Sequence, residues 1–383
     1  MSIRNIKQHI ILNLKNIPGW STKRKIVVFI SDDWGDFRIH SQEEYETLLS
    51  YGLPLDKTPH TKTESMANYR DLDRLFEVLD SVKDRKGRPA ILSPFTIMAN
   101  PDFDRIRETG FSQYYYKPFT DTLREQPGGT KTIERWMEGI SRGIFQPELH
   151  GREHINVPIW MRKLQSGDKV YQFCFDNRFA HYTAPDSNVP IQASYFTERE
   201  DDFYFLDDSL ADGIRLFESV FNRKPTVFNP PNAIFDSRYY MTLFNNGIKN
   251  IDSSHWRMEP DGKGNVDKKR RKFGEISDEG IVHFISNCAF EPVRKTTNVV
   301  GDTMKQVAAA FKWGKPALIN THRVNFVTGR NGTHVDRSLK QFAELLQSIN
   351  KNWPEAEFMG AGEFAQYMNS TLTKGKYQKA KKR

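Results

Sequence analysis

The sequence has few cysteines and no long hydrophobic run. Its 383 residues include only Cys174 and Cys288, which lie in apolar surroundings and follow no pairing pattern. We therefore expect buried free thiols and a reducing compartment, the cytoplasm. No apolar stretch reaches the length that crosses a membrane, and residues 10–14 are too short, with Asn13 among them, for the apolar region of a signal peptide. These absences argue against a disulfide scaffold and an integral membrane protein.

The sequence also lacks a pattern typical of nucleic-acid binding. The net charge is +8, but much of the excess lies in residues 263–272 and 374–383, and such runs are usually solvated. There is no zinc-finger spacing and no repeat in which basic and aromatic residues alternate. We expect no nucleic-acid partner, while peripheral membrane contact through the N-terminal helix or the basic tail stays open.

What the sequence does contain is a regular alternation of strands and helices. Short apolar runs alternate with amphipathic segments about seven or eight times. This pattern favours an α/β fold, a (β/α) barrel of seven to eight parallel strands that can be distorted or incomplete. We expect an N-terminal helical segment over residues 1–24, one barrel domain over 25–370, and a basic disordered tail over 371–383. Long loop insertions are expected near residues 99–130, 155–205 and 255–280.

Two adjacent carboxylates stand where the first strand should end. The apolar run 25–30 predicts a buried strand, and Asp32 and Asp33 follow it after one serine. Because successive side chains of a strand point to opposite faces, we expect one aspartate to bind a metal and the other to face a substrate or a water. Alone, such a pair is more often a turn with solvated acids.

Two histidines four residues apart, His150 and His154, follow another predicted strand. They would share one face if the backbone were helical there, although such a pair is a weak signal alone. Their placement adds weight, since several polar residues fall at predicted strand ends, which is where barrel enzymes build their sites. These residues are Asp32, Asp33, His150, Asn229, Asn232, Asp252 and His322.

The residue types at these strand ends indicate metal-dependent hydrolysis. Asp33, His150 and His154 would supply one carboxylate oxygen and two imidazole nitrogens, which leaves positions open as in catalytic zinc sites. Such a metal polarises a carbonyl oxygen and acidifies a water. Asp32 would then act as the general base, and His322, from the opposite side, would protonate the leaving group.

These motifs resemble those of the polysaccharide deacetylase family, the NodB-type carbohydrate esterases. Residues 30–35, Ile-Ser-Asp-Asp-Trp-Gly, resemble the family's Thr-Phe-Asp-Asp-Gly, and residues 150–154 match its His-x-x-x-His. Residues 229–232 are similar to its Arg-x-Pro-Tyr, and residues 319–322 to its Leu-x-His. The resemblance covers about residues 25–365. The resemblance implies that a divalent metal, with zinc as the first candidate, assists the removal of an N- or O-acetyl group from a carbohydrate. It gives Asp33, His150 and His154 the role of metal ligands, Asp32 that of the base and His322 that of the acid.

The sequence departs from the family pattern at three positions. Asn229 stands where the family has the arginine that pairs with the base, and Trp34 is inserted before the motif glycine. The nearest match for the aspartate that orients the acid histidine is Asp252. Arginines that would supply the missing charge are Arg38, Arg152 and Arg323. Substrate contacts are expected from Trp34, Asn229, Pro230, Asn232 and Arg323. Three other functions remain open: a different metal-dependent C–N hydrolase, a catalytically degenerate carbohydrate-binding protein, and an anion-binding protein that uses residues 263–272 and the basic tail.

Overall fold

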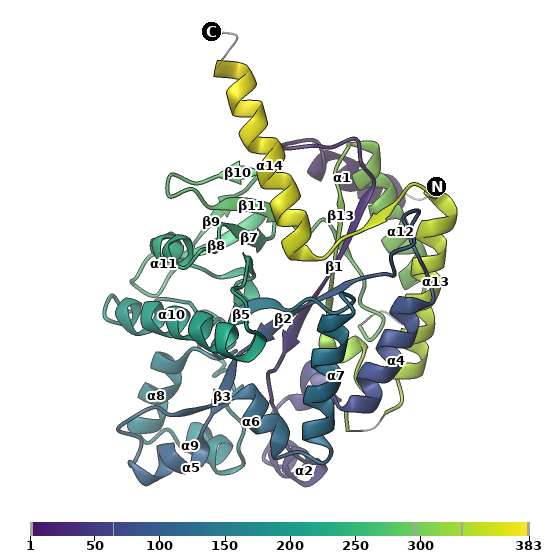
Figure 1. Ribbon diagram of the computed structural model, residues 1–383. Coiled ribbons are helices and arrows are strands. Elements are labelled where there is room, and N and C mark those ends of the chain that lie inside the picture. Colours follow the sequence, from purple (N-terminus) through teal and green to yellow (C-terminus); the bar gives the residue numbers. More distant parts are fainter. Residues whose placement is uncertain (1–2, 64, 295–296, 331, 381–383) are drawn as a thin grey trace.

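A ten-stranded sheet forms the centre of the molecule, as the computed structural model shows (Figure 1). The structure describes residues 3–63, 65–294, 297–330 and 332–380. All neighbouring strands of the sheet path are parallel except β10 and β11. The order is β10 (Glu275–Ile276), β11 (Val282–Ile285), β7 (Asn250–Ser253), β6 (Val227–Phe228), β5 (Glu148–Gly151), β2 (Leu92–Ile97), β1 (Ile26–Trp34), β13 (Ala317–His322) and β12 (Cys288–Ala289), and β14 (Glu357–Phe358) also pairs with β1.

The sheet is an open (β/α) barrel, which confirms the predicted fold. Among the described residues, the two outer strands of the path, β10 and β12, do not pair with each other. The helices are α1 (Ile3–Lys15), α2 (Gln42–Ser50), α3 (Pro59–Lys62), α4 (Tyr69–Asp80), α5 (Phe103–Glu108), α6 (Phe119–Arg124), α7 (Gly129–Ser141), α8 (Val157–Gln165), α9 (Lys169–Asp176), α10 (Asp202–Phe221), α11 (Tyr240–Asn245), α12 (Val299–Lys312), α13 (Val335–Asn352) and α14 (Ala361–Ala380). No helix in the described part of the chain is long and apolar enough to cross a membrane.

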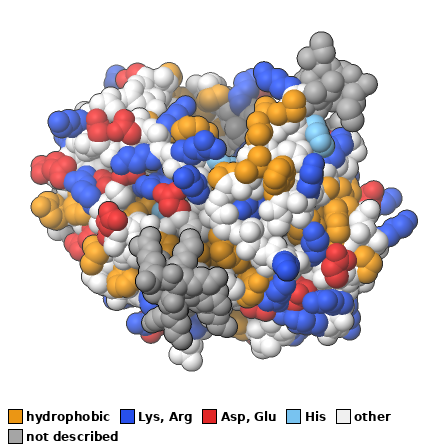
Figure 2. Space-filling view, turned by 90° about the horizontal axis from the view of Figure 1, so that it is seen from above, with side chains coloured by type: hydrophobic (Ala, Val, Ile, Leu, Met, Phe, Trp, Pro, Cys, Tyr) orange, Lys and Arg blue, Asp and Glu red, His pale blue; other side chains and the backbone are white. Residues whose placement is uncertain are grey.

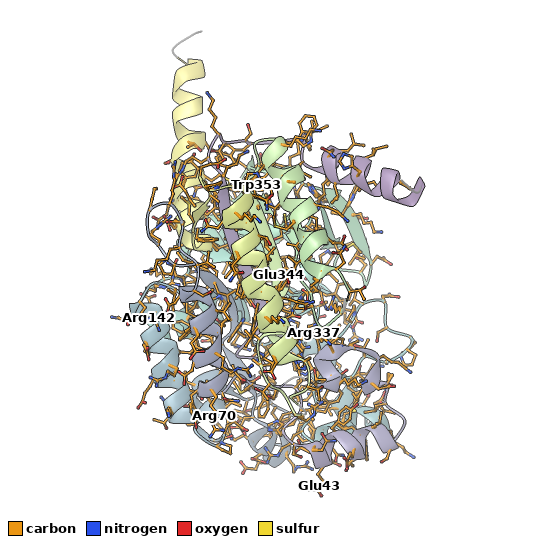
Figure 3. The ribbon with its side chains drawn as sticks, turned by 90° about the vertical axis from the view of Figure 1, so that its right-hand side faces the viewer. Glu43, Arg70, Arg142, Arg337, Glu344 and Trp353 are labelled. Carbon is orange, nitrogen blue, oxygen red and sulfur yellow. The ribbon has the colours of Figure 1, made fainter. Side chains whose placement is uncertain are left out.

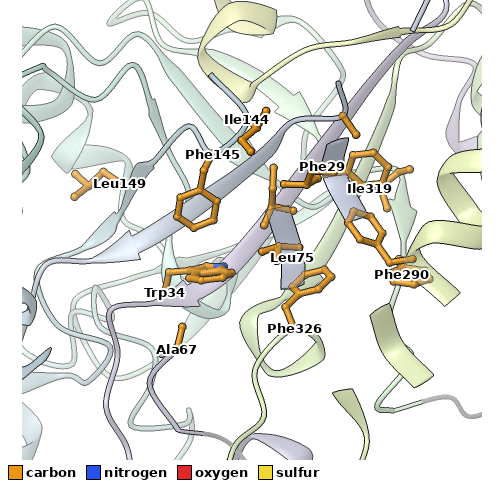
Figure 4. Packing of buried hydrophobic residues seen from close by; sticks show 14 of the residues in the cluster. Phe29, Trp34, Ala67, Leu75, Ile144, Phe145, Leu149, Phe290, Ile319 and Phe326 are labelled. Atoms are coloured by element: carbon orange, nitrogen blue, oxygen red, sulfur yellow. The ribbon is translucent and has the colours of Figure 1, made fainter. Parts of the chain in front are cut away.

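The two faces of β1 pack against different layers, as alternation along a strand requires. Val27 and Phe29 belong to the large cluster under the outer helices, where the Phe29 and Phe342 rings lie 5.1 Å apart, edge to face (Figure 4). Figure 3 views these helices from the solvent side, where polar residues such as Glu344 of α13 are exposed. Ile26, Val28 and Ile30 instead pack against α14 in a second cluster, which we call the inner cluster. The central strand is therefore buried on both sides.

The C-terminal helix covers the end of the barrel where the strands begin. Met359, just before α14, donates its backbone N–H to Val27 O near the start of β1, and Phe364 packs in the inner cluster. Figure 2 views this side of the molecule and shows lysine and arginine side chains lying among acidic and apolar ones. The helix continues through Ala380, whereas a disordered tail was expected from residue 371. At the start of the expected tail, Thr371 Oγ1 accepts a hydrogen bond of 2.9 Å from the indole of Trp20. The last part of the expected tail, residues 381–383, lies outside the described residues.

Residues 16–24, which we call the N-terminal strap, cross the open side of the sheet. The backbone N–H of Trp20 donates to Phe273 O at 2.7 Å, just before β10. The backbone N–H of Thr22 donates to Gly314 O at 2.7 Å, close to the start of β13. The strap thus joins two sides of the barrel that no strand pairing joins.

The three expected insertions contain regular structure. Residues 99–130 hold a hairpin of β3 (Ala99–Pro101) and β4 (Tyr116–Pro118), with α5, α6 and the first residues of α7. Residues 155–205 hold α8, α9 and the start of α10, and residues 255–280 hold a hairpin of β8 (Trp256–Pro260) and β9 (Val266–Arg270), followed by β10. The segments expected as loop insertions are therefore largely folded into helices and strands. The prediction for the cysteines is confirmed, because both are buried and free.

Candidate active site

The first strand ends in a β-bulge that turns two consecutive aspartates into one cavity. The register between β1 and β2 shifts between Ser31 and Trp34, and Asp33 has a φ of 70°, which is uncommon for a residue other than glycine. Asp32 and Asp33 both line a cavity of about 550 Å³ at the carboxyl ends of the strands. The expectation that they face opposite sides of the sheet was wrong, because the bulge rotates the second carboxylate inward.

The same bulge moves Trp34 to the outer face of the sheet. Its indole packs edge to face on Phe145 (Figure 4). It also packs edge to face on Trp136, and Nε1 donates to Ser31 Oγ at 2.8 Å. The next residue must be glycine, since Gly35 has a φ of 84° and a Cβ there would lie 2.1 Å from the carbonyl oxygen of Ile97. The residue that looks inserted in the sequence is therefore absorbed by the bulge and the hydrophobic core.

The three predicted ligands meet in the cavity. Asp33 Oδ1 lies 3.0 Å from His154 Nε2 and 3.7 Å from His150 Nε2, and all three side chains are buried. His150 Nδ1 donates to the backbone carbonyl of Asn229 at 2.7 Å, which leaves Nε2 as the ligand atom. Zinc bonds of about 2.0–2.2 Å in a tetrahedron separate two ligands by roughly 3.4 Å. This donor set therefore fits a divalent metal.

A loop, and not a helix, brings the two histidines together. β5 ends at Gly151, where φ is 140°, and α8 begins only at Val157. The centroids of the His150 and His154 rings nevertheless lie 5.1 Å apart. The helical spacing considered from the sequence was the wrong reason for a correct pairing.

Arg38 is the arginine that lies beside Asp33, one of the predicted metal ligands. It donates to Asp33 Oδ2 at 3.0 Å and to Asp36 Oδ2 at 2.7 Å. Burial would raise the pKa of Asp33, but Arg38 and His154 outweigh it and hold that pKa well below its usual range. Of the other two candidates, Arg152 donates to Glu153 and Asp212, and Arg323 donates to the backbone oxygen of Asp36.

Asp32 is held by neutral amides. Asn229 Nδ2 donates to its Oδ1 at 3.1 Å, and Asn320 Nδ2 donates to its Oδ2 at 2.9 Å. Burial raises the pKa of Asp32, even though His150 and His322 act in the opposite direction. A carboxylate whose pKa is raised toward neutrality is a better proton acceptor, so this environment suits a general base.

His322 ends β13 directly beside Asp32 in the parallel register. Its Nδ1 lies 2.5 Å from Glu291 Oε1. Burial lowers the pKa of His322, but the charge of Glu291 and the hydrogen bond to it outweigh burial and raise the pKa to about 9. The carboxylate expected in this place was Asp252, which instead accepts hydrogen bonds from Asn229 and Ser286. Glu291 escaped the sequence reasoning because β12, the strand just before it, has only two residues.

Several other side chains at this site were not anticipated. His60, in α3, places Nδ1 3.3 Å from Asp33 Oδ2, and its ring centroid is 5.0 Å from that of His322. Asn320 also faces the cavity, as does Arg294, whose guanidinium lies 2.7 Å from His60 Nε2. No local motif marks His60 or Arg294, since both lie on connections between the strands.

The predicted substrate-binding residues divide into two groups. Asn229, Pro230 and Asn232 line the cavity. Trp34 and Arg323 are not among its lining residues, because both are almost fully buried in the surrounding packing. The structure therefore brings the expected machinery together but leaves these two side chains outside the cavity.

Comparisons with known proteins add similar folds at low identity. The chain matches no protein-family model, and no curated protein matches it. A solved structure of a Mycobacterium smegmatis protein named as a polysaccharide deacetylase is 13% identical, with a TM-score of 0.43 over 93% of this chain and 94% of that one. A Parabacteroides distasonis protein named as a glycoside hydrolase/deacetylase is 9% identical, with a TM-score of 0.49 over 92% and 72%. Puue allantoinase is 12% identical, with a TM-score of 0.44 over 92% and 93%. Because the identities and TM-scores are this low, the comparisons support no conclusion about function, which rests on the geometry of the site alone.

Proposed function

We propose that this protein is a metal-dependent deacetylase, a divergent relative of the NodB-type carbohydrate esterases, that removes an N- or O-acetyl group from a carbohydrate. The observation that carries the proposal is the convergence of five side chains, from the ends of β1, β5 and β13 and the loop after β5, in one cavity. They are Asp32, Asp33, His150, His154 and His322. A proton acceptor, a proton donor and a three-ligand set within one cavity form the minimum machinery for metal-assisted hydrolysis.

A divalent metal on Asp33, His150 and His154, zinc first among the candidates, would polarise the acetyl carbonyl and acidify a water. The other groups move protons. Asp32 takes the proton of the attacking water, since its carboxylate faces the same cavity and the two amides orient it. His322 gives a proton from Nε2 to the leaving nitrogen or oxygen, because Nδ1 is engaged by Glu291.

The cavity is suited to a carbohydrate. Its volume of about 550 Å³ lies in the range of small-molecule sites, and its lining mixes amides, hydroxyls and charged groups that can bond to sugar hydroxyls. We assign substrate contacts to Asn229, Pro230 and Asn232, which line this cavity, with Asn229 bonded to the base. The polarity of this lining favours a sugar over an apolar acyl substrate.

One observation favours a second candidate, a carbohydrate-binding protein without activity. Among the described residues, Asp32 receives hydrogen bonds from two amides and from no arginine. An arginine lowers the pKa of its partner carboxylate, whereas a neutral amide compensates less for burial. A protonated Asp32 would be unable to act as a base. A different C–N hydrolase on the same machinery is the third candidate.

Metal content and acetate release separate these candidates. We expect purified protein to contain zinc by mass spectrometry and to release acetate from N-acetylated chitooligosaccharides or O-acetylated oligosaccharides. His150→Ala should lose the ion bound at the catalytic site together with the activity. The matched control is His283→Ala, since His283 is a buried histidine outside the cavity that contacts Tyr240, and it should retain both. A metal-loaded wild-type protein that binds these oligosaccharides by calorimetry without releasing acetate would establish the binding protein instead.

A further inference from the structure

Arg38 joins two carboxylates that face histidines in the same manner. Its guanidinium contacts the Oδ2 atoms of Asp33 and Asp36, so each carboxylate has its Oδ1 left for another partner. Asp33 Oδ1 faces His154 Nε2 at 3.0 Å, and Asp36 Oδ1 faces His181 Nε2 at 3.2 Å. The pattern at the predicted metal site is therefore repeated next to it, three residues further along the chain.

Unsatisfied histidine nitrogens surround this second carboxylate. His154 and His181 are both more than nine-tenths buried. His154 Nδ1 and both ring nitrogens of His181 have no hydrogen-bond partner within the described part of the chain. Buried polar atoms are normally satisfied, so each such nitrogen calls for a ligand, an ion or a water. The approach of His181 to Asp36 is close but does not have the geometry of a hydrogen bond, as expected of two groups that point toward a third.

We propose that Asp36, His154 and His181 form a second divalent-metal site, which adjoins the first and shares the His154 ring with it. One ligand atom of each of the three residues lies within 4.8 Å of the other two. The separation of 3.2 Å between Asp36 and His181 is close to the roughly 3.4 Å between two ligands of a tetrahedral ion. Two imidazoles and one carboxylate suit zinc or a similar transition metal better than calcium or magnesium.

The His154 ring serves both sites through its two nitrogens. Nε2 faces Asp33, so Nδ1 remains for the second ion. When both sites are filled, the ring has released its remaining proton to solvent, and each ion holds one nitrogen. Three protein ligands leave the second ion one position for a water.

The second ion would be structural. Asp36 and His181 are not among the residues that line the cavity, so an ion between them lies behind the catalytic groups. His181 belongs to the insertion 155–205, where Gln192 Nε2 donates to its backbone oxygen at 2.9 Å. The ion would therefore tie this insertion to the end of β1 and fix the orientation of His154. This role is separate from the proposed function, apart from the shared ring.

The number of bound ions tests the proposal. The full-length protein is stripped with a chelator, loaded with excess Zn²⁺, desalted, and assayed for zinc per chain by mass spectrometry. We expect about two ions in the wild type, about one in His181→Ala, about one in His150→Ala and almost none in His154→Ala. His283→Ala is the control for loss of a buried histidine outside any of these ligand groups and should keep about two.

Each failure identifies the site that is wrong. About one ion in the wild type, or an unchanged count in His181→Ala, overturns the second site and leaves the proposed catalytic site standing. A count that falls in His181→Ala but not in His150→Ala supports the second site and removes the metal from the proposed function. If His181→Ala does not fold, Asp36→Asn replaces it, and cobalt loaded in place of zinc reports by its visible spectrum whether one environment is lost while the other remains.

Discussion

Replacing Glu291 by glutamine should lower the pKa of His322 and move the alkaline limit of activity to lower pH. Glutamine keeps the volume of the side chain, and Asn325 Nδ2, which donates to Glu291 Oε2 at 2.9 Å, remains next to it. Only the negative charge beside His322 Nδ1 is removed. Because burial alone lowers the pKa of His322, the raised value depends on its acidic neighbours, Glu291 first among them.

The size of the effect follows from the two pKa values. With Glu291, the pKa of His322 is about 9, and without its charge we expect a pKa near 6.5, the ordinary value of histidine, because Asp32 and Asp33 still act against burial. At pH 8, the protonated fraction then falls from about 0.9 to roughly 0.03. An acid that must be protonated loses activity as pH rises through its pKa, so the variant should lose about 30-fold at pH 8 and less than about twofold at pH 6.

The assay is the pH profile of kcat/KM for acetate release, with the His322 pKa measured independently by NMR titration. Glu291→Asp, which keeps the charge at a longer distance, should show an alkaline limit between those of the wild type and Glu291→Gln. A uniform loss of rate at every pH, with an unchanged titration of His322, would refute the assignment of Glu291 as the group that holds the proton on this ring.

Three further outcomes are expected. Asp32→Asn should retain zinc and lose at least about 10²-fold in kcat, the scale of a general base, and a variant with full kcat would exclude that role. Trp34→Ala should lower the free energy of unfolding in denaturant melts by about 3–5 kcal/mol, because its buried indole packs on Trp136 and Phe145, and a loss under about 1 kcal/mol would contradict this packing. Gly35→Ala should yield little soluble protein, since its Cβ would clash with a backbone oxygen, and a melting temperature equal to that of the wild type would show that the turn adapts.

The strand ends were predictable from the sequence because a simple rule places them. Parallel strands bring their carboxyl ends to one edge of a barrel, so the residue that follows each apolar run falls there. Asp32 and His322 lie next to each other in the register of β1 and β13, although they are 290 positions apart in the sequence. Strand periodicity was sufficient for this part of the site.

The position of the strand ends does not predict the direction in which the Asp33 side chain points. An extended strand would turn its side chain away from Asp32, and only the left-handed backbone at Asp33 brings both into the cavity. A bulge of this kind is stabilised by the packing of Trp34 and the close approach of Gly35 to β2, which are tertiary contacts. Trp34, the extra residue before Gly35, was the only sign of this bulge in the sequence.

The residues that the sequence did not reveal lie on connections. Glu291 follows a strand of two residues, His60 lies in a helix of four, and His181 lies in an insertion. Such segments have no periodicity that fixes where their side chains point, and their positions come from the parts of the barrel on which they pack. The helical end of the chain, expected to be disordered, was missed for the same reason, because its stabilising contact with Trp20 comes from the other end of the sequence.

The N-terminal strap has a consequence for the order in which the protein folds. It is synthesised long before its partners Phe273, Lys315 and Thr371, which leave the ribosome much later. Contacts between such distant parts of a chain form slowly, and until then the strap has no place to dock. Chains arrested on the ribosome before residue 360 should therefore remain open to protease within the strap, and protection should appear only after α14 has emerged. The strap is thus made early and becomes native late.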